Sequence, residues 1–154
     1  MNDKTLSNAV FEVSLKLVVK DTNNRILLLK VPDNNQMAGY FDLPGGRINE
    51  SEKTQSLKTA IQRELVEELG HNMQLEIKET PVAVGRHGYI SKDTGEERWI
   101  FWVLFEAMYK RGEIQISSEH KEYEWVDVNA NNLTKLFTRG PLETMSNYIT
   151  GVLG

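Results

Sequence analysis

The strongest constraint on this chain is an acidic segment with helical spacing that follows a glycine-rich turn. Residues 63–70 read Arg-Glu-Leu-Val-Glu-Glu-Leu-Gly, downstream of Leu-Pro-Gly-Gly at 43–46. Glu64, Glu67 and Glu68 are three and four residues apart, so they share one helical face. Like charges at these spacings repel by about 0.2–0.5 kcal/mol per pair. A divalent cation would remove this repulsion, which makes the segment a candidate metal site.

The apolar residues of the same region predict a helix over residues 56–69. They recur every three or four positions and comprise Leu57, Ala60, Ile61, Leu65 and Leu69. Gly70 fits the position that follows the last turn, where a residue without Cβ adopts a left-handed conformation easily. Three residues could supply the N-cap, namely Ser51, Thr54 and Ser56.

The angular position of the acids favours a metal site over a simple charged surface. At about 100° per residue, Glu64 and Glu68 fall on the border of the apolar stripe, not opposite it. A carboxylate there is half-buried, where charge is costly unless it is paired or metal-bound. The alternative is a charged helix flank whose acids form local salt bridges, for instance to Arg63 or Lys58.

Composition limits the kind of site that this chain can build. Its 154 residues, of which 40% are hydrophobic, suit one domain with a sizeable core, and we expect residues 1–154 to form it. The absence of cysteine excludes disulfides and thiolate metal sites. A formal net charge of −4 argues against a nucleic-acid-binding surface. A nucleotide substrate remains compatible, because a bound cation can offset local negative charge.

The distribution of apolar residues favours a cytoplasmic protein without membrane contact. Residues 1–9 are polar and lack the apolar core of a signal peptide. The longest apolar run, at 99–105, is far too short to cross a bilayer.

The remaining periodicities predict a mixed sheet packed between helices, which is an α/β or α+β sandwich. Strands are predicted at 10–20, 25–31, 73–89 with an interruption near Pro81, 98–109 (buried on both faces) and 122–128. Asn129 or Asn131 could cap a helix through Phe137. Pro141 could open a last helix to Ile149, which Gly151 would end.

The glycine and glutamate pattern carries a family resemblance. Gly46 and Glu52, followed by residues 63–70, look like the Nudix box, a loop–helix motif that is highly specific when its glycines and glutamates coincide. The resemblance covers roughly residues 10–128 and implies a Nudix-type α/β/α sandwich with a central mixed sheet. It also implies hydrolysis of a diphosphate linkage.

One departure from the family pattern lies in the loop before the helix. The pattern leaves seven residues between its first glutamate and the arginine, whereas residues 53–62 make ten here. The simplest account is a three-residue insertion in the loop, which costs little because loop-closure entropy grows slowly with length. Glu50, Glu52 and Gln55 all remain possible partners of Arg63.

The resemblance assigns roles to individual residues. Glu67 and Glu68 would be the main metal ligands, Glu64 a further ligand or the group that orients the attacking water, and the Gly46 carbonyl would complete the site. Arg63 would fix the helix against the loop. Oxygen donors suit Mg²⁺, with Mn²⁺ as a possible substitute.

Four further positions are candidates outside the box. Glu119 could be a general base or an extra ligand, or else a solvated acid in an acidic loop. Arg86 and Arg98 could pair with substrate phosphate, or could form surface salt bridges. Tyr89 lies near the position at which some dinucleoside polyphosphate hydrolases of the family carry a tyrosine.

The leading hypothesis is a Mg²⁺-dependent Nudix hydrolase. Its small-molecule substrate would be a nucleoside diphosphate linked to another group: a nucleoside triphosphate, a nucleotide sugar or a dinucleoside polyphosphate. The alternative is a non-catalytic Nudix-like module that senses a nucleotide. An isoprenoid diphosphate isomerase is disfavoured, since that branch resembles a cysteine-dependent site. The family often forms homodimers, so a homodimer is possible.

Overall fold

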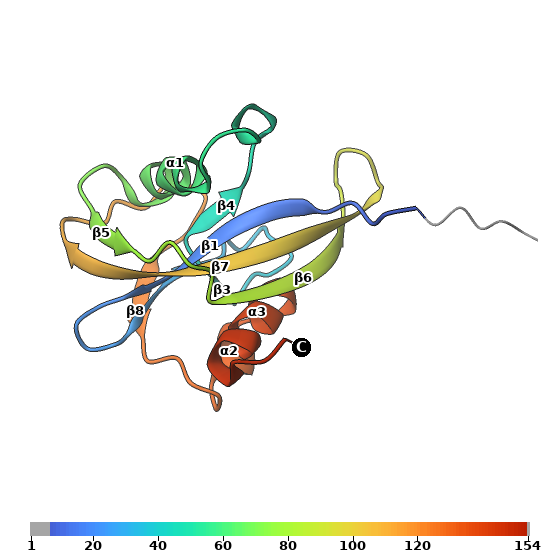
Figure 1. Ribbon diagram of the computed structural model, residues 1–154. Coiled ribbons are helices and arrows are strands. Elements are labelled where there is room, and N and C mark those ends of the chain that lie inside the picture. Colours follow the sequence, from blue (N-terminus) through green and yellow to red (C-terminus); the bar gives the residue numbers. More distant parts are fainter. Residues whose placement is uncertain (1–6, 154) are drawn as a thin grey trace, which may run out of the picture.

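Two long strands form the centre of the sheet in the computed structural model, which describes residues 7–153 (Figure 1). β1 (Glu12–Lys20) and β7 (Glu97–Arg111) run parallel, in register from the Glu12–Ile100 pair to the Lys20–Met108 pair. Both strands are rich in β-branched and aromatic residues, which suit a pleated sheet. The expectations for residues 1–6 and 154 lie outside the described range.

Each central strand pairs along its outer edge with two shorter strands, one after the other, so the sheet divides at both edges. β2 (Ile26–Lys30) pairs with the end of β1 at Lys20, whereas β4 (Gly45–Arg47) pairs with β1 at residues 14–16. Along β7, the partners are β6 (Ala83–Ile90) and β5 (Gln74–Ile77). β3 (Phe41–Asp42) and β8 (Tyr123–Val126) both pair with β2.

Helix α1 (Leu57–Leu69) covers one face of this sheet (Figure 1). Its predicted apolar stripe packs in one core with alternate residues of β1, namely Leu15, Leu17 and Val19, although Leu57 stays half-exposed. Of the three possible N-caps, Ser56 caps the helix, since its side chain accepts the Lys58 N–H at 3.3 Å. Gly70 ends it with a φ of 84°.

Helices α2 (Leu133–Leu136) and α3 (Arg139–Thr150) cover the opposite face. Phe137 and Met145 from this layer pack in a second core with Val18 and Leu28 of the sheet. The two faces together make the α/β/α sandwich that the sequence predicts.

The predicted starts of these two helices were wrong. Asn132 is the N-cap residue of α2, in place of Asn129 or Asn131. All three asparagines can form local turns. Here Asn129 and Asn132 are bonded to each other: the Asn132 side chain accepts the Asn129 N–H at 2.9 Å, and the Asn132 N–H donates to the Asn129 carbonyl at 3.2 Å. Helix α3 begins at Arg139, before Pro141, and runs to Thr150, one residue beyond the predicted Ile149. Gly151 ends it, as predicted, and has a left-handed conformation.

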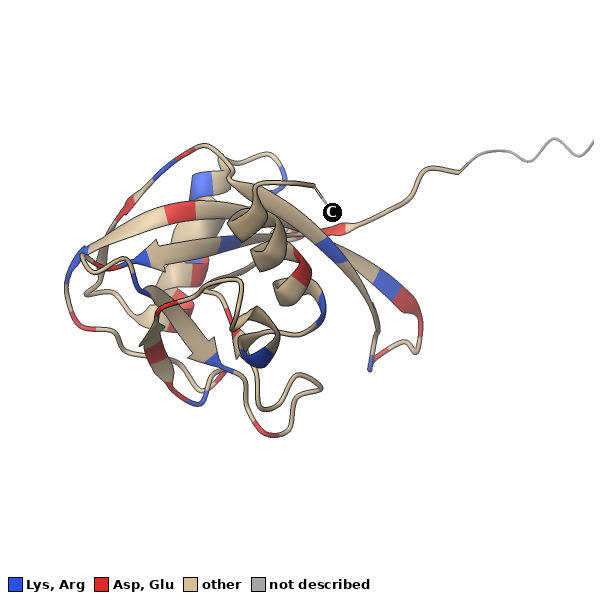
Figure 2. Cartoon of the chain, turned by 90° about the horizontal axis from the view of Figure 1, so that it is seen from below, with Lys and Arg blue, Asp and Glu red and all other residues tan. Residues whose placement is uncertain are grey.

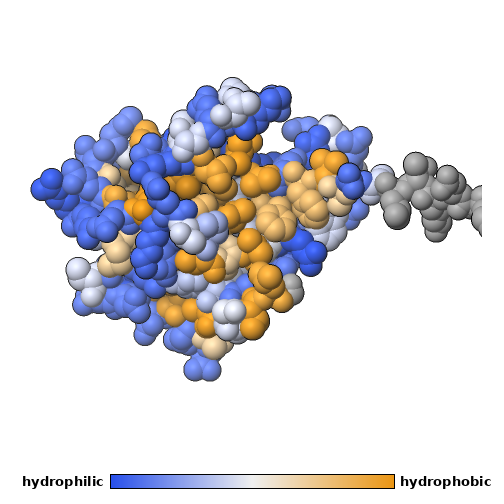
Figure 3. Space-filling view, in the orientation of Figure 1, coloured by the Kyte–Doolittle hydropathy of each residue, from blue (hydrophilic) through white to orange (hydrophobic). Residues whose placement is uncertain are grey.

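Charged residues of both signs are distributed along the whole described part of the chain in the view from below. Lys and Arg residues are interspersed with Asp and Glu residues along the strands and loops (Figure 2). In the orientation of Figure 1, apolar residues are visible at the surface along the sheet, between α1 and the helices of the opposite face (Figure 3). Within residues 7–153, no helix has the length and apolar character needed to cross a membrane.

Candidate active site

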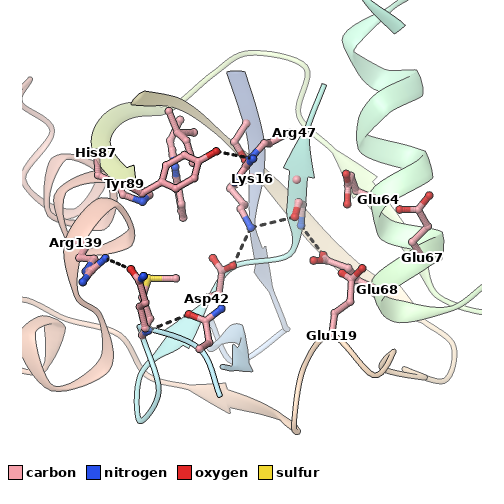
Figure 4. Close-up of a pocket in the computed structure, with 18 of the residues that line it drawn as sticks. Lys16, Asp42, Arg47, Glu64, Glu67, Glu68, His87, Tyr89, Glu119 and Arg139 are labelled. Atoms are coloured by element: carbon pink, nitrogen blue, oxygen red, sulfur yellow. Dashed lines mark hydrogen bonds and ion pairs between the residues drawn. The ribbon is translucent and has the colours of Figure 1, made fainter. Parts of the chain in front are cut away.

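A cavity of about 760 Å³ opens where β4 and the acidic face of α1 meet β1. Its acidic lining residues are Asp42, Glu64, Glu67, Glu68 and Glu119. Its basic ones are Lys16, Arg47, Arg63, Lys92 and Arg139. Figure 4 shows Glu64, Glu67, Glu68 and Glu119 at one end, with His87, Tyr89 and Arg139 at the other. The cavity is therefore electrically polarised along its length.

The three helix glutamates line this cavity at graded depths. Glu68 is buried with 3% exposure, the Glu64 side chain is 14% exposed, and the Glu67 side chain is 52% exposed. This order follows their angular positions, because Glu64 and Glu68 flank the stripe that packs on the sheet. All three acids present oxygen atoms to the same cavity, although their roles as ligands remain a prediction.

Glu68 is a buried carboxylate with little compensation. Its Oε2 accepts the Gly45 N–H at 2.7 Å. Burial raises the pKa of Glu68 to about 8, even though the Lys16 charge and the Gly45 hydrogen bond oppose this shift. At neutral pH, full ionisation of Glu68 would require positive charge beyond what these two neighbours supply.

Lys16 lines the cavity at a position that no sequence motif indicated. Its Nζ donates to Asp42 at 3.0 Å and to the carbonyls of Leu43 and Gly45 at 3.1 and 3.0 Å. Burial favours its neutral form, but the carboxylates of Asp42 and Glu68 hold the pKa of Lys16 above its ordinary value. The signal was a charged residue at the centre of an otherwise apolar strand. The ammonium ties the glycine loop to β1.

Gly46 brings the loop backbone against the helix carboxylates. A methyl group at Gly46 would collide with the carboxylate of Glu64. The absence of a side chain therefore leaves a cradle between β4 and α1.

Arg63 uses all five of its N–H donors. Two go to Glu52, with Nε–Oε1 at 2.5 Å and Nη2–Oε2 at 3.0 Å. The others reach Glu64 at 2.8 Å, Glu67 at 3.1 Å and the Arg47 carbonyl at 3.0 Å. Arg63, bound this way, lowers the pKa of Glu52, and Glu52 raises that of Arg63. The partner that the sequence left open is thus Glu52.

The residues between Glu52 and α1 form a turn. Glu52 ends the short 3-10 helix η1 (Glu50–Glu52), and residues 53–55 lead from it to the Ser56 cap. The longer loop therefore leaves the contact between Glu52 and Arg63 intact. Whether residues 53–55 are an insertion relative to the family remains a prediction.

Glu119 reaches the cavity from a loop that is bonded to the end of α1. The Gln115 N–H donates to the Leu69 carbonyl at 2.9 Å, and the Ser117 N–H donates to the Glu68 carbonyl at 3.1 Å. Figure 4 shows Glu119 at the same end of the cavity as Glu68. The side chain of Glu119 is exposed and lines the cavity, so the solvated and functional interpretations are both compatible with its position.

Only one of the three predicted substrate-binding residues lines the cavity. The Tyr89 hydroxyl accepts from Arg47 at 3.1 Å, and the Arg47 guanidinium lies 5.1 Å from the Tyr89 ring centroid. Arg98 instead bonds Glu12 at 3.2 Å, and Arg86 lies 3.9 Å from Glu143. These two arginines form surface salt bridges, the alternative that the sequence left open.

The end of the cavity remote from the glutamates contains two further residues that the sequence did not single out as ligand-binding. Arg139 has a φ of 52°, unusual for a non-glycine residue, and its Nη1 donates to Gln36 at 2.9 Å. His87 lies against Gly140 and Trp102, and burial lowers the pKa of its imidazole. Tertiary packing, and no short motif, brings both residues to the cavity.

The donor atoms at the acidic end fit a hard divalent cation. No group of three acidic or histidine side chains within residues 7–153 already converges on a point that suits a metal ion. Even so, the Lys16 charge only partly compensates Glu68, the glycine cradle leaves room, and Glu64 and Glu67 share a single Arg63 nitrogen. Carboxylate oxygens are the ligands that Mg²⁺ and Mn²⁺ prefer.

Comparison with known proteins agrees with this geometry. The sequence matches the NUDIX domain over residues 11–146. Nucleoside triphosphatase NudI of Escherichia fergusonii is 30% identical over 104 residues, which are 65% of this chain and 71% of that protein.

Two solved structures share the fold. A MutT protein from Methanosarcina mazei has a TM-score of 0.62 at 24% identity, with 92% of this chain and 91% of that chain covered. An ADP-ribose pyrophosphatase from Streptococcus suis has a TM-score of 0.57 at 20% identity, with 92% of each chain covered. Because the domain match spans most of the sequence, the chain belongs to the Nudix family and is a hydrolase of the pyrophosphohydrolase type.

Proposed function

We propose that this enzyme is a Mg²⁺-dependent hydrolase of a nucleoside diphosphate linked to another group. The single observation that carries the proposal is the polarised cavity, in which three helix glutamates face a glycine cradle and the remaining lining includes Lys16, Arg47, Lys92 and Arg139. Such a lining suits a ligand that is anionic and is bridged to acidic residues by a cation. Nucleoside triphosphates, nucleotide sugars and dinucleoside polyphosphates all have this character, and NudI is named as a nucleoside triphosphatase.

In this proposal, each residue at the acidic end of the cavity has a role that follows from its position. Glu64, Glu67 and Glu68, with the Gly46 carbonyl, would hold the cation. When bound, the cation would neutralise phosphate charge and lower the pKa of a coordinated water. Glu119 would accept a proton from the attacking water, and Arg63 would orient Glu64 and Glu67 through its hydrogen bonds.

Lys16 and Arg47 would favour the anionic substrate from the other side of the cradle. Lys16 is held in place by Asp42 and by two backbone carbonyls, so its charge is fixed before any ligand arrives. Fixed charges that need no rearrangement stabilise a developing anion more strongly than mobile ones.

The test is hydrolysis of a nucleotide panel with Mg²⁺ or Mn²⁺, in which released phosphate or pyrophosphate is measured. We expect turnover of at least one class, and Glu67→Gln should lower it about 100-fold, in the range seen when one electrostatic group is removed. Glu113→Gln is the control, because Glu113 is exposed and does not line the cavity. Tight nucleotide binding without hydrolysis by the wild type would identify a sensor module and overturn the proposal.

A further inference from the structure

His120 is a buried histidine that faces the deepest carboxylate of the cavity. Its side chain is 8% exposed, and its Nδ1 lies 4.0 Å from Oε1 of Glu68. This Nδ1 is buried and has no hydrogen-bond partner among residues 7–153. A buried polar nitrogen without a partner is costly, so its position calls for an explanation.

The two carboxylate oxygens of Glu68 differ in their hydrogen bonding. Oε2 is fixed by the Gly45 N–H at 2.7 Å, whereas Oε1 has no hydrogen bond with any of the described residues. A donor and an acceptor that could pair therefore lie 4.0 Å apart. A shortening of about 1 Å would bring Nδ1 and Oε1 to ordinary hydrogen-bond distance.

The backbone holds His120 beside Glu68 independently of this contact. The Ser117 N–H donates to the Glu68 carbonyl at 3.1 Å, and the His120 N–H donates to the Ser117 carbonyl at 3.3 Å. The loop is thus attached to the same residue whose side chain the imidazole faces. A small side-chain adjustment can close the gap without movement of the loop.

We infer that His120 is a positioning residue that donates its Nδ1–H to Oε1 of Glu68 and so fixes this carboxylate in the orientation that binds a divalent cation. The inference rests on the proposed function only through the cation. Donors behind a ligating side chain fix its orientation and raise metal affinity, and their loss typically weakens binding about 10–100-fold. The donation requires a tautomer of the neutral ring, without a change of charge.

Two substitutions of His120 distinguish the effect of its hydrogen-bond donor from the effect of its ring volume. His120→Phe keeps a ring of similar size and removes the donor. His120→Asn places a side-chain N–H near the position of Nδ1 and should restore it. His71→Phe is the matched control, because His71 is exposed and does not line the cavity.

The measurement is the Mn²⁺ dissociation constant of each protein without nucleotide, by electron paramagnetic resonance, with the melting temperature in EDTA as a check of folding. We expect about 10-fold weaker binding for His120→Phe, and values within about threefold of wild type for His120→Asn and His71→Phe. In a Glu68→Gln background, His120→Phe should add no further loss.

The outcomes distinguish this inference from the proposed function. Equal affinity in wild type and His120→Phe overturns the inference, and so does an Asn variant that binds as weakly as the Phe variant. A wild type that binds Mn²⁺ but hydrolyses no nucleotide overturns the proposed function, and leaves the inference to be decided by the affinities. A wild type without Mn²⁺ binding overturns both.

Discussion

Arg63 and Glu52, eleven residues apart in the sequence, face each other in a two-bonded ion pair between the acidic helix and the loop before it. The same guanidinium also reaches Glu64, Glu67 and a β4 carbonyl, so one side chain joins the loop, the helix and the sheet. A lysine has three donors on a single nitrogen and cannot reproduce this planar fork.

Arg63→Lys should therefore lower both stability and activity. We expect the melting temperature to fall by about 3–6 °C, as for the loss of one to two kcal/mol in a domain of this size, and turnover to fall more than 10-fold. Differential scanning fluorimetry and the nucleotide assay measure the two effects. Arg98→Lys, which affects an exposed pair with Glu12, should change neither. An unchanged Arg63→Lys enzyme would contradict the structural role of the fork.

Adjacent glycines of the cradle should respond differently to alanine. Gly46 has no positive φ, and the atoms nearest to a new methyl group would be those of the Glu64 carboxylate, the far end of a flexible side chain. Gly45 has a φ of 123°, and its methyl group would meet the Leu15 backbone. Gly46→Ala should thus fold with a melting temperature within a few degrees of wild type and lose activity, whereas Gly45→Ala should be unstable. Full activity of Gly46→Ala would argue against a role for the cradle.

Glu68 should make the metal-free protein less stable as pH rises. Its pKa is about 8 when folded and about 4.5 as an ordinary glutamate, so the folded state retains a proton that the unfolded state has lost between these values. The contribution is complete below pH 4.5, and declines by up to about 1.4 kcal/mol per pH unit until pH 8.

Guanidinium unfolding in EDTA across this pH range measures the slope. Glu68→Gln should flatten it, since the amide does not titrate, and millimolar Mg²⁺ should stabilise the wild type most near pH 8. Identical slopes for the wild type and Glu68→Gln would show that Glu68 ionises normally.

Glu106 should have the opposite dependence at low pH. Its carboxylate accepts hydrogen bonds from Lys20, Lys78 and the Tyr148 hydroxyl. Burial acts to raise its pKa, but these donors outweigh burial and lower the pKa to about 2. This contribution to stability is therefore present above pH 4.5 and is lost as pH falls towards 2.

Glu106→Gln should consequently melt below the wild type at pH 7, with a difference that shrinks towards pH 2. Thermal unfolding monitored by circular dichroism at several pH values gives the comparison. Glu113→Gln, at an exposed position, should match the wild type throughout. A constant difference across the pH range would assign the effect to packing.

The sequence alone determined the features that depend on local periodicity. The helix ending at Gly70, the position of Glu64 and Glu68 beside the apolar stripe, and the sandwich of helices around a mixed sheet all follow from where apolar residues recur, although Glu68 is more deeply buried than its predicted half-buried position. A helix repeats every 3.6 residues whatever lies around it, so a side chain's angle to the apolar stripe can be calculated from the sequence. The prediction of the α2 N-cap was wrong because the neighbouring asparagines have the same capping ability, so the sequence does not distinguish Asn132 from Asn129 or Asn131.

Only the tertiary structure decided which distant segments meet. The register of β1 with β4 places Lys16 beneath the glycine loop, and backbone bonds to the end of α1 bring Glu119 and His120 to Glu68. The tertiary structure also pairs Arg86 and Arg98 with surface glutamates, and Arg63 with Glu52. Such contacts join residues across strand pairings and long loops, where no sequence period carries the information; they are set by the packing of the whole sheet.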